Sequence, residues 1–190
     1  LKNKKLPKIV KFNKAYLKNI DIIFTALPNG EAQEISKHLL VNNRLIDLAA
    51  DFRLEDPKEY KKWYKINHKA VKNISNSIYA IPEISKKYLK NYKIIGCPGC
   101  YPTSVLLPLL PLLKKNLISH KNIIIDSKSG YSGAGRGIHR RNARKNLYES
   151  LSAYGVGKHR HSSEIHQEIA KVCKKHFTFI FTPHLTPMFR

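Results

Sequence analysis

Short apolar runs typical of buried β-strands recur along this chain, with stretches of helical pattern between them. Strands are predicted at residues 21–27, 44–49, 92–96, 122–126, 152–156 and 177–182, and helices at 31–41, 56–65 and 162–175. Strands joined through helices run parallel, because each helix carries the chain back to the edge from which the next strand starts. The sequence therefore predicts an α/β fold with a mainly parallel sheet.

The strand at 92–96 leads into the motif Pro-Gly-Cys-Tyr-Pro-Thr at 98–103, which places the thiol of Cys100 where a strand turns into a helix. The free N–H groups and the positive dipole end of a helix N-terminus stabilise a thiolate, the nucleophilic form of cysteine. Pro108 and Pro111 each remove a backbone donor, so we expect this helix to be short or kinked. Cys100 is a candidate nucleophile.

Other roles for Cys100 stay open at this point. A single cysteine is most often a small buried hydrophobe. Cys97 and Cys100 form a C-x-x-C pair, a pattern of redox-active dithiols. They would also make half of a zinc site with His159 and His161, but no second C-x-x-C exists and H-x-H is not a spacing that structural zinc sites favour.

Two histidines precede the last predicted helix, whose expected cap is Ser162, in the motif His159-Arg160-His161. An imidazole titrates near neutral pH, so either histidine is a candidate general acid or base, with Arg160 beside it to hold an anionic group. A cysteine nucleophile needs such a base near its thiol. The chain has nine histidines, however, and most are expected to be surface residues.

A loop rich in glycine and serine, residues 127–137, follows the predicted strand at 122–126. Its backbone N–H groups are unobstructed by side chains, and such loops cradle phosphates or dinucleotides. The loop matches neither G-x-G-x-x-G nor a P-loop, so a flexible connector is the alternative.

The net charge is +22, a balance that proteins binding nucleic acids or other anions often show. The lysines are scattered along the chain, and the densest basic patch, from Arg136 to Lys145, follows the glycine-rich loop. A small ligand that carries a phosphate fits this patch as well as a nucleic acid does. We therefore expect no nucleic-acid partner, and a basic nucleic-acid-binding protein is the alternative from a different class.

Three cysteines do not suggest a disulfide framework and fit a reducing compartment. The longest apolar run, residues 104–113, is too short to span a bilayer, and the first residues lack the apolar core of a signal peptide. We expect a cytoplasmic protein without a membrane partner. The chain starts at Leu1 and stops at Arg190 just after a strand, which suggests a fragment cut at both ends.

Seven blocks, in one order along nearly the whole chain, resemble the N-acetyl-gamma-glutamyl-phosphate reductase family, the arginine-biosynthesis branch of the aspartate-semialdehyde and glyceraldehyde-phosphate dehydrogenase group. The blocks are residues 24–30, 46–54, 79–83, 98–103, 129–136, 154–165 and 182–188. The resemblance implies an incomplete doubly wound NADP-binding (Rossmann) domain at residues 1–99. Part of an α+β catalytic domain of the glyceraldehyde-phosphate dehydrogenase type would follow at residues 100–190.

Position by position, the resemblance implies a role for Cys100 as the nucleophile and for His159 as the acid/base residue, with His161 as the second candidate for that role. Leu27 and Pro28 would lie against the cofactor at the carboxyl end of a strand, where open α/β sheets bind ligands. The other candidates are Ser129 and Gly130 for NADP(H), and Arg136, Tyr154, Arg160 and His161 for the phosphate and carboxylate of the substrate.

The implied reaction is the NADPH-dependent reduction of N-acetyl-L-glutamyl 5-phosphate to the 5-semialdehyde and phosphate, through a thioester on Cys100. The implied partners are this small acyl phosphate and further copies of the chain in a homo-oligomer. Aspartate-semialdehyde dehydrogenase and the lysine-pathway reductase of a carrier-bound aminoadipyl phosphate are close alternatives.

The sequence departs from the family where Cys97 replaces the usual Asn and Ser163 the usual Pro. Cys97 is therefore expected to have no catalytic role, unless it inactivates Cys100 by forming a disulfide with it. The family's opening strand and its glycine-rich turn, which seat the pyrophosphate, would precede Leu1. The chain is thus expected to be roughly half to two thirds of an enzyme.

Overall fold

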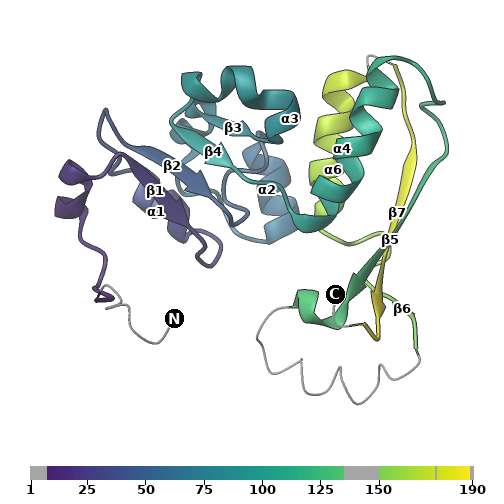
Figure 1. The fold of residues 1–190 in the computed structure, drawn as a ribbon, viewed down its shortest axis with the longest axis horizontal. Coiled ribbons are helices and arrows are strands. Elements are labelled where there is room, and N and C mark those ends of the chain that lie inside the picture. Colours follow the sequence, from purple (N-terminus) through teal and green to yellow (C-terminus); the bar gives the residue numbers. More distant parts are fainter. Residues whose placement is uncertain (1–7, 135–149, 174, 189–190) are drawn as a thin grey trace, which may run out of the picture.

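The computed structural model describes residues 8–134, 150–173 and 175–188. Within these ranges two β-sheets are seen, each with helices against it, and the chain passes from one to the other at the start of α4 (Figure 1). The elements are η1 (Lys14–Asn19), β1 (Ile22–Thr25), α1 (Glu31–Ser36), β2 (Arg44–Asp47), α2 (Pro57–Tyr64), η2 (Val71–Asn76), β3 (Ser77–Tyr79), α3 (Pro82–Ser85), η3 (Lys86–Asn91), β4 (Ile94–Gly96), α4 (Cys100–Lys114), β5 (Ile123–Gly130), η4 (Tyr131–Ala134), β6 (Ser152–Ala153), α6 (His161–Val172) and β7 (Phe179–Thr186), where η marks a 3-10 helix.

The first sheet has the strand order β1-β2-β4-β3, and all of its strand pairs are parallel. Gly96, the last residue of β4, lies opposite Asp47 of β2 and Tyr79 of β3. The carboxyl ends of these three strands therefore meet at one edge of the sheet. The predicted parallel α/β architecture is confirmed, and the motif that contains Cys100 starts from that edge.

Two small clusters of buried side chains hold α1, α2 and the loop after β2 against this sheet. They consist of Ala32, Leu45, Phe52, Ala70 and Ile94 in one, and of Ala50, Leu54, Tyr60 and Tyr64 in the other. The carbonyl of Phe52 lies so close to Gly96 that a β-carbon at position 96 would collide with it. This close approach brings Arg53 beside the turn that leads to Cys100.

The second sheet has the order β5-β7-β6, with β5 parallel and β6 antiparallel to β7. Helices α4 and α6 pack side by side on one of its faces (Figure 1). The core between these layers is apolar and includes Leu106, Leu110, Leu113, Ile125, Ile165, Ile169 and Phe181. Tyr79 and Ile81, from the edge of the first sheet, belong to the same core, so buried apolar contacts join the two sheets.

Helix α2 follows the sequence prediction closely. The side chain of Asp56 caps it by accepting a hydrogen bond from the Lys58 N–H at 2.7 Å, and Pro57 occupies the first helical position. The helix ends at Lys65, which adopts the left-handed conformation with φ = 63°.

Helix α4 corrects the prediction that Pro108 and Pro111 would make it short, because it runs without interruption for 15 residues. Both prolines are exposed, as are Ser104 and Leu107, whose carbonyls lose their helical donors. Water can reach those carbonyls, so the missing hydrogen bonds leave no buried polar group.

Other boundaries also differ from the prediction. Helix α1 ends at Ser36 rather than near residue 41, because the chain continues in 3-10-type turns from Lys37 to Leu39. Helix α6 begins at His161 with Arg160 as its cap residue, so Ser162 does not cap it. Strands β5 and β7 are both longer than predicted, since each continues in register with the other as far as Gly130 and Thr186.

Candidate active site

Cys100 is the first residue of α4, and Gly99 is the cap residue before it. Its thiol is free and the residue is exposed. Three residues separate it from the end of β4, so the predicted strand-to-helix junction is confirmed. The N–H groups of the first turn of α4 point toward the same end of the helix as the thiol.

Tyr101 connects Cys100 to a group of aromatic side chains. Its ring contacts the rings of His159 and His161, with centroids 5.7 and 5.9 Å apart, and its hydroxyl lies 2.8 Å from that of Tyr154. The His159 ring also lies 5.5 Å from the Tyr154 ring and 4.7 Å from the His161 ring. The structure therefore brings three of the predicted site residues, Tyr154, His159 and His161, to the start of α4.

The surroundings of both histidines favour the neutral form of the imidazole. Burial, and then the positive charge of Arg160, lower the pKa of His159 below its ordinary value. Burial, His159 and Arg53 lower the pKa of His161 to about 3. A neutral imidazole accepts a proton, and the Nδ1 atom of His159 already accepts a hydrogen bond from the His161 N–H at 3.2 Å. His159 is the less buried of the two and so the better placed to exchange protons with a ligand.

Tyr154 lies close enough to Cys100 for the two to interact electrostatically. Burial and the hydrogen bond with Tyr101 raise the pKa of Tyr154, and the proximity of Cys100 acts in the same direction. Tyr154 is held in place by β7, because its N–H donates to the Pro183 carbonyl at 3.0 Å. A neutral phenol in this position can donate a hydrogen bond to a bound ligand.

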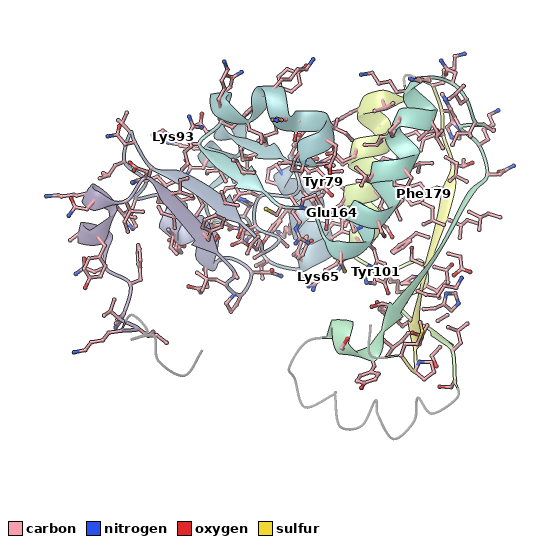
Figure 2. All side chains as sticks on the ribbon, viewed as in Figure 1. Lys65, Tyr79, Lys93, Tyr101, Glu164 and Phe179 are labelled. Atoms are coloured by element: carbon pink, nitrogen blue, oxygen red, sulfur yellow. The ribbon has the colours of Figure 1, made fainter. Side chains whose placement is uncertain are left out.

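Glu164 is a buried carboxylate that the sequence did not single out for the site. Its Oε2 accepts hydrogen bonds from the Gly99 N–H at 2.9 Å and from the Tyr79 hydroxyl at 3.0 Å, and its Oε1 lies 3.2 Å from the Arg53 guanidinium. Burial raises the pKa of Glu164, and these donors oppose the rise. Three donors face the carboxylate, so we assign it as ionised at neutral pH. In Figure 2 Glu164 and Tyr79 lie between the two sheets.

Leu27 and Pro28 lie in the turn between β1 and α1, and both are exposed at the carboxyl end of β1. Two N–H groups at the start of α1 are already occupied, because the Asp51 carboxylate accepts from the Gly30 N–H at 2.7 Å and from the Gln33 N–H at 3.3 Å. An internal carboxylate thus fills the place that a phosphate takes at other helix N-termini. The turn therefore presents an exposed apolar surface and not a phosphate-binding site.

The remaining predicted site residues are spread more widely. Ser129 and Gly130 end β5 instead of opening a loop, and in the described part of the chain no hydrogen bond links them to Cys100. Arg160 is exposed, with its guanidinium 5.7 Å from the centroid of the Tyr64 ring. Arg136 lies outside the described residues.

Cys97 differs from Cys100 in its surroundings. It is half-buried, and burial followed by the charge of Asp47 raises the pKa of its thiol. Its backbone is held firmly, since its N–H donates to the Asp47 carbonyl at 2.8 Å and its carbonyl accepts from Arg53 Nε at 2.7 Å. The thiolate, the form needed for disulfide exchange, is therefore disfavoured at Cys97.

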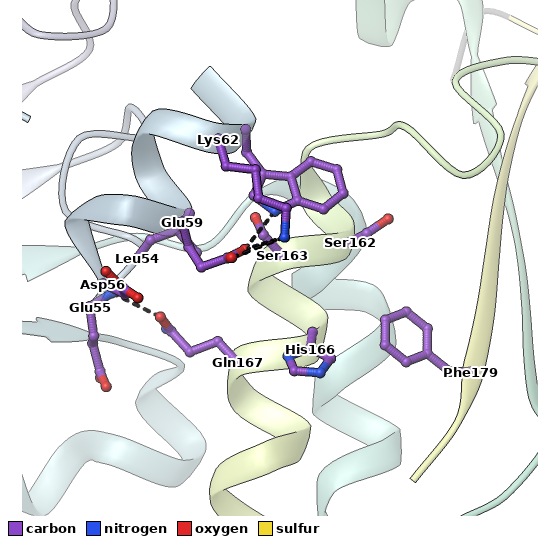
Figure 3. A pocket seen from close by; sticks show the side chains of 11 residues that line it. Leu54, Glu55, Asp56, Glu59, Lys62, Ser162, Ser163, His166, Gln167 and Phe179 are labelled. Atoms are coloured by element: carbon purple, nitrogen blue, oxygen red, sulfur yellow. Dashed lines mark hydrogen bonds and ion pairs between the residues drawn. The ribbon is translucent and has the colours of Figure 1, made fainter. Parts of the chain in front are cut away.

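A cleft of about 540 Å³ lies between α2 and α6 (Figure 3). Its lining is Leu54, Glu55, Asp56, Glu59, Lys62, Trp63, Ser162, Ser163, His166, Gln167 and Phe179. Inside it, the Gln167 side chain points to Glu55 and accepts from its N–H at 2.8 Å (Figure 3). Neither Cys100 nor His159 lines this cleft, so it is distinct from the surroundings of the thiol.

In residues 8–134, 150–173 and 175–188, no group of three or more His, Cys, Asp or Glu side chains is arranged to hold a metal ion. In the same ranges, no helix has the length and apolar character needed to cross a bilayer.

Comparison with known proteins gives matches along nearly the whole chain. The family model described as "Semialdehyde dehydrogenase, NAD binding domain" matches residues 1–92, and the one described as "Semialdehyde dehydrogenase, dimerisation domain" matches residues 100–190. The second match begins at Cys100.

Curated relatives agree with these family models. The chain is 46% identical over all of its length to a probable N-acetyl-gamma-glutamyl-phosphate reductase, chloroplastic, of Arabidopsis thaliana. It is 44% identical over 95% of its length to an N-acetyl-gamma-glutamyl-phosphate reductase of Clostridium novyi, and 47% identical over 90% to one of Desulforamulus reducens. The matched segments cover 47%, 53% and 50% of these proteins, so the chain spans about half the length of the relatives it matches. The chain belongs to the semialdehyde dehydrogenase family, an oxidoreductase family, and resembles its N-acetyl-gamma-glutamyl-phosphate reductases.

Proposed function

We propose that the full-length protein reduces N-acetyl-L-glutamyl 5-phosphate to N-acetyl-L-glutamate 5-semialdehyde and phosphate with NADPH, in arginine biosynthesis. The observation that carries the proposal is the exposed thiol of Cys100 at the first position of α4, with Tyr154 and His159 beside its neighbour Tyr101. The names of the relatives supply the substrate.

Cys100 accepts the acyl group in this scheme. His159 takes up the thiol proton, and the thiolate sulfur forms a bond to the acyl carbon while the carbonyl electrons move onto oxygen. The N–H groups of the first turn of α4 hold that oxyanion. When it collapses, the bond from carbon to the phosphate oxygen breaks, phosphate leaves with the electron pair, and a thioester remains on Cys100.

NADPH, when bound, supplies the hydride that converts the thioester carbon to an aldehyde. The sulfur of Cys100 leaves that carbon as a thiolate, so the nucleophile is regenerated. The exposed apolar surface of Leu27 and Pro28 fits an apolar ring of the cofactor. The N-terminus of α1, which is capped by Asp51, does not fit the phosphates of the cofactor. We assign Ser129 and Gly130 to the nicotinamide side of the cofactor.

Substrate anions are assigned to the basic and phenolic groups near Cys100. Arg160 is exposed at the start of α6, and Tyr154 presents its hydroxyl beside Tyr101, so these two are assigned to the phosphate and carboxylate. His161 is a weaker candidate because its ring is buried. The assignment of Arg136 rests on the sequence resemblance alone.

We assign residues 1–99 to the NADP-binding domain and residues 100–190 to part of the catalytic domain. A homo-oligomer is proposed because residues 100–190 match a dimerisation domain. A cytoplasmic location is proposed because a free thiol nucleophile needs a reducing compartment; import of the full-length protein into a plastid would contradict it.

The proposed function is tested by comparing Cys100→Ser with Cys97→Ser in the full-length protein. Cys100→Ser should lower kcat by several orders of magnitude, because a hydroxyl without a strong base is a poor nucleophile, and Cys97→Ser should keep most of the activity. Equal losses from both variants would support the dithiol oxidoreductase instead. Activity on aspartyl or aminoadipyl phosphate in place of the proposed substrate would support the related reductases. Salt-sensitive nucleic-acid binding without thiol-dependent turnover would contradict an enzyme of this class.

A further inference from the structure

The turn that precedes Cys100 is held at both ends by one ion pair. The Cys97 carbonyl accepts a hydrogen bond from Arg53 Nε at 2.7 Å, and the Gly99 N–H donates to Glu164 Oε2 at 2.9 Å. Arg53 and Glu164 are themselves joined at 3.2 Å. The two side chains thus close a ring of contacts around residues 97–99.

The Arg53–Glu164 pair is buried, and both side chains also make hydrogen bonds to other groups. The Arg53 side chain is 10% exposed and the Glu164 side chain 0%. Arg53 also donates to the Leu48 carbonyl at 3.0 Å, and Glu164 also accepts from Tyr79. A buried ion pair is often no more stabilising than apolar residues of the same size, because removing two charges from water is costly. Stability alone therefore does not explain why a pair stands here.

The first turn of α6 also holds Gly99 from a second side. A β-carbon at position 99 would lie 2.5 Å from the His161 Nε2 atom, so the imidazole rests directly against the glycine. The backbone of Gly99 needs no left-handed conformation, since its φ is −65°. Contact with His161, rather than backbone geometry, therefore makes glycine necessary, and Gly99 sits between His161 and Glu164.

We propose that Arg53 and Glu164 are positioning residues for Cys100, which fix the backbone of residues 97–99 so that the thiol and the first N–H groups of α4 keep the spacing needed for acyl transfer. The role rests on the proposed function of Cys100 as nucleophile. Neither side chain touches the substrate in this proposal. They act through the turn at residues 97–99. The loop after β2, the end of β3 at Tyr79 and helix α6 are thereby connected to the nucleophile.

The test compares Glu164→Gln with Glu55→Gln in the full-length enzyme. Glu55 is a matched control, since it also joins the loop after β2 to α6, through an exposed ion pair with Lys171 at 2.6 Å, without contacting the turn. Glu164→Gln should lower kcat on the order of 10- to 100-fold, as misplacement of a reacting group does, while KM for the acyl phosphate changes by less than about threefold. Alkylation of Cys100 by iodoacetamide at fixed pH, followed on its peptide by mass spectrometry, should slow at least about threefold. Glu55→Gln should leave all three values within about twofold of wild type.

A folded Glu164→Gln enzyme with wild-type kcat and wild-type alkylation of Cys100 would overturn the positioning role, as would equal effects of the two substitutions. If Glu164→Gln does not fold, Tyr79→Phe decides. It removes one donor from Glu164 and leaves the ion pair, so kcat and alkylation should each fall at least about twofold, and unchanged values would overturn the proposal. An inactive wild-type enzyme would instead contradict the proposed function, whereas the alkylation experiment needs no turnover and still reports on positioning.

Discussion

At the scale of single residues, the two histidines near Cys100 have different surroundings. His161 is buried against Gly99, and its pKa of about 3 keeps it neutral throughout the physiological range. His159 is half-buried, contacts Tyr101 and Tyr154, and carries a pKa lowered to a lesser degree by burial and Arg160. A residue that must gain and lose a proton cannot be held permanently neutral, so these surroundings favour His159 as the acid/base residue and His161 as a support for the turn.

The acid limb of the pH–rate profile should report on His159. Because its pKa is lowered, its neutral form persists below pH 6.5, so kcat/KM should decline only below that pH. His159→Asn should lower kcat by about 10²- to 10⁴-fold and remove the limb. Steady-state kinetics between pH 5 and 8 check both. A decline of the wild-type kcat/KM that begins above pH 6.5, or an acid limb that is still present in His159→Asn, would exclude this role for His159.

His161 should make the protein less stable in acid. The unfolded chain binds a proton at this histidine below about pH 6.5, whereas the native state does not until about pH 3. The free energy of unfolding should therefore fall as pH decreases through this window, with a slope of about one proton from His161. Urea unfolding at pH 7, 6 and 5 should show a smaller decrease for His161→Asn than for wild type, and equal decreases would refute the assignment.

At the scale of elements, apolar runs predicted where most strands lie and that they pair mainly in parallel, although some apolar residues of these runs are exposed, such as Phe24 in β1 and Ile124 in β5. Strand β3 was not predicted, because three residues are too few to show a periodic pattern. Helix α4 was expected to be short, because the sequence does not reveal that its two internal prolines lie on the solvent-exposed face. The extensions of β5 and β7 depend on mutual pairing across 57 residues, as between Thr186 and Ser129, which no local pattern contains.

The end of α2 gives an element-scale prediction about stability. Lys65 is in the left-handed conformation, which costs a residue with a β-carbon about 1 kcal/mol relative to glycine. Lys65→Gly should therefore raise the free energy of unfolding by roughly 0.5–1 kcal/mol. Lys61→Gly, inside the same helix and also exposed, is the control and should lower it by about 1 kcal/mol. Thermal or urea unfolding checks this, and changes of the same sign at both positions would contradict it.

At the scale of the whole molecule, the candidate site is assembled from both sheets. Cys100 and the two histidines were predicted from local motifs, since a nucleophile at a helix start and a histidine pair are visible in short stretches. The Arg53–Glu164 pair was not, because 111 residues separate its members and each alone resembles an ordinary surface charge. The positions of Tyr79 and Tyr154 likewise depend on contacts between distant segments.

The pair also predicts how the two sheets depend on each other. Either Arg53→Met or Glu164→Gln leaves one buried charge without its partner, so each should lower the free energy of unfolding by about 3–5 kcal/mol. The double variant removes both charges and should recover much of that loss, yet it should not recover kcat, because Arg53→Met removes the donor to the Cys97 carbonyl and the ion pair that fixes the turn before Cys100. A double-mutant cycle of urea unfolding with parallel kinetics checks this. Additive losses of stability would refute the buried pair, and recovery of kcat would refute its positioning role.

An acyl group bound to Cys100 is the species that the proposed reaction requires. Full-length protein is mixed with freshly generated N-acetylglutamyl phosphate in the absence of NADPH, quenched in acid, digested and examined by mass spectrometry. The peptide that contains Cys100 should carry an N-acetylglutamyl group on that residue, and addition of NADPH before the quench should discharge it. Turnover without any acyl group on Cys100, or an acyl group on Cys97 in its place, would contradict the assignment of Cys100 as the nucleophile.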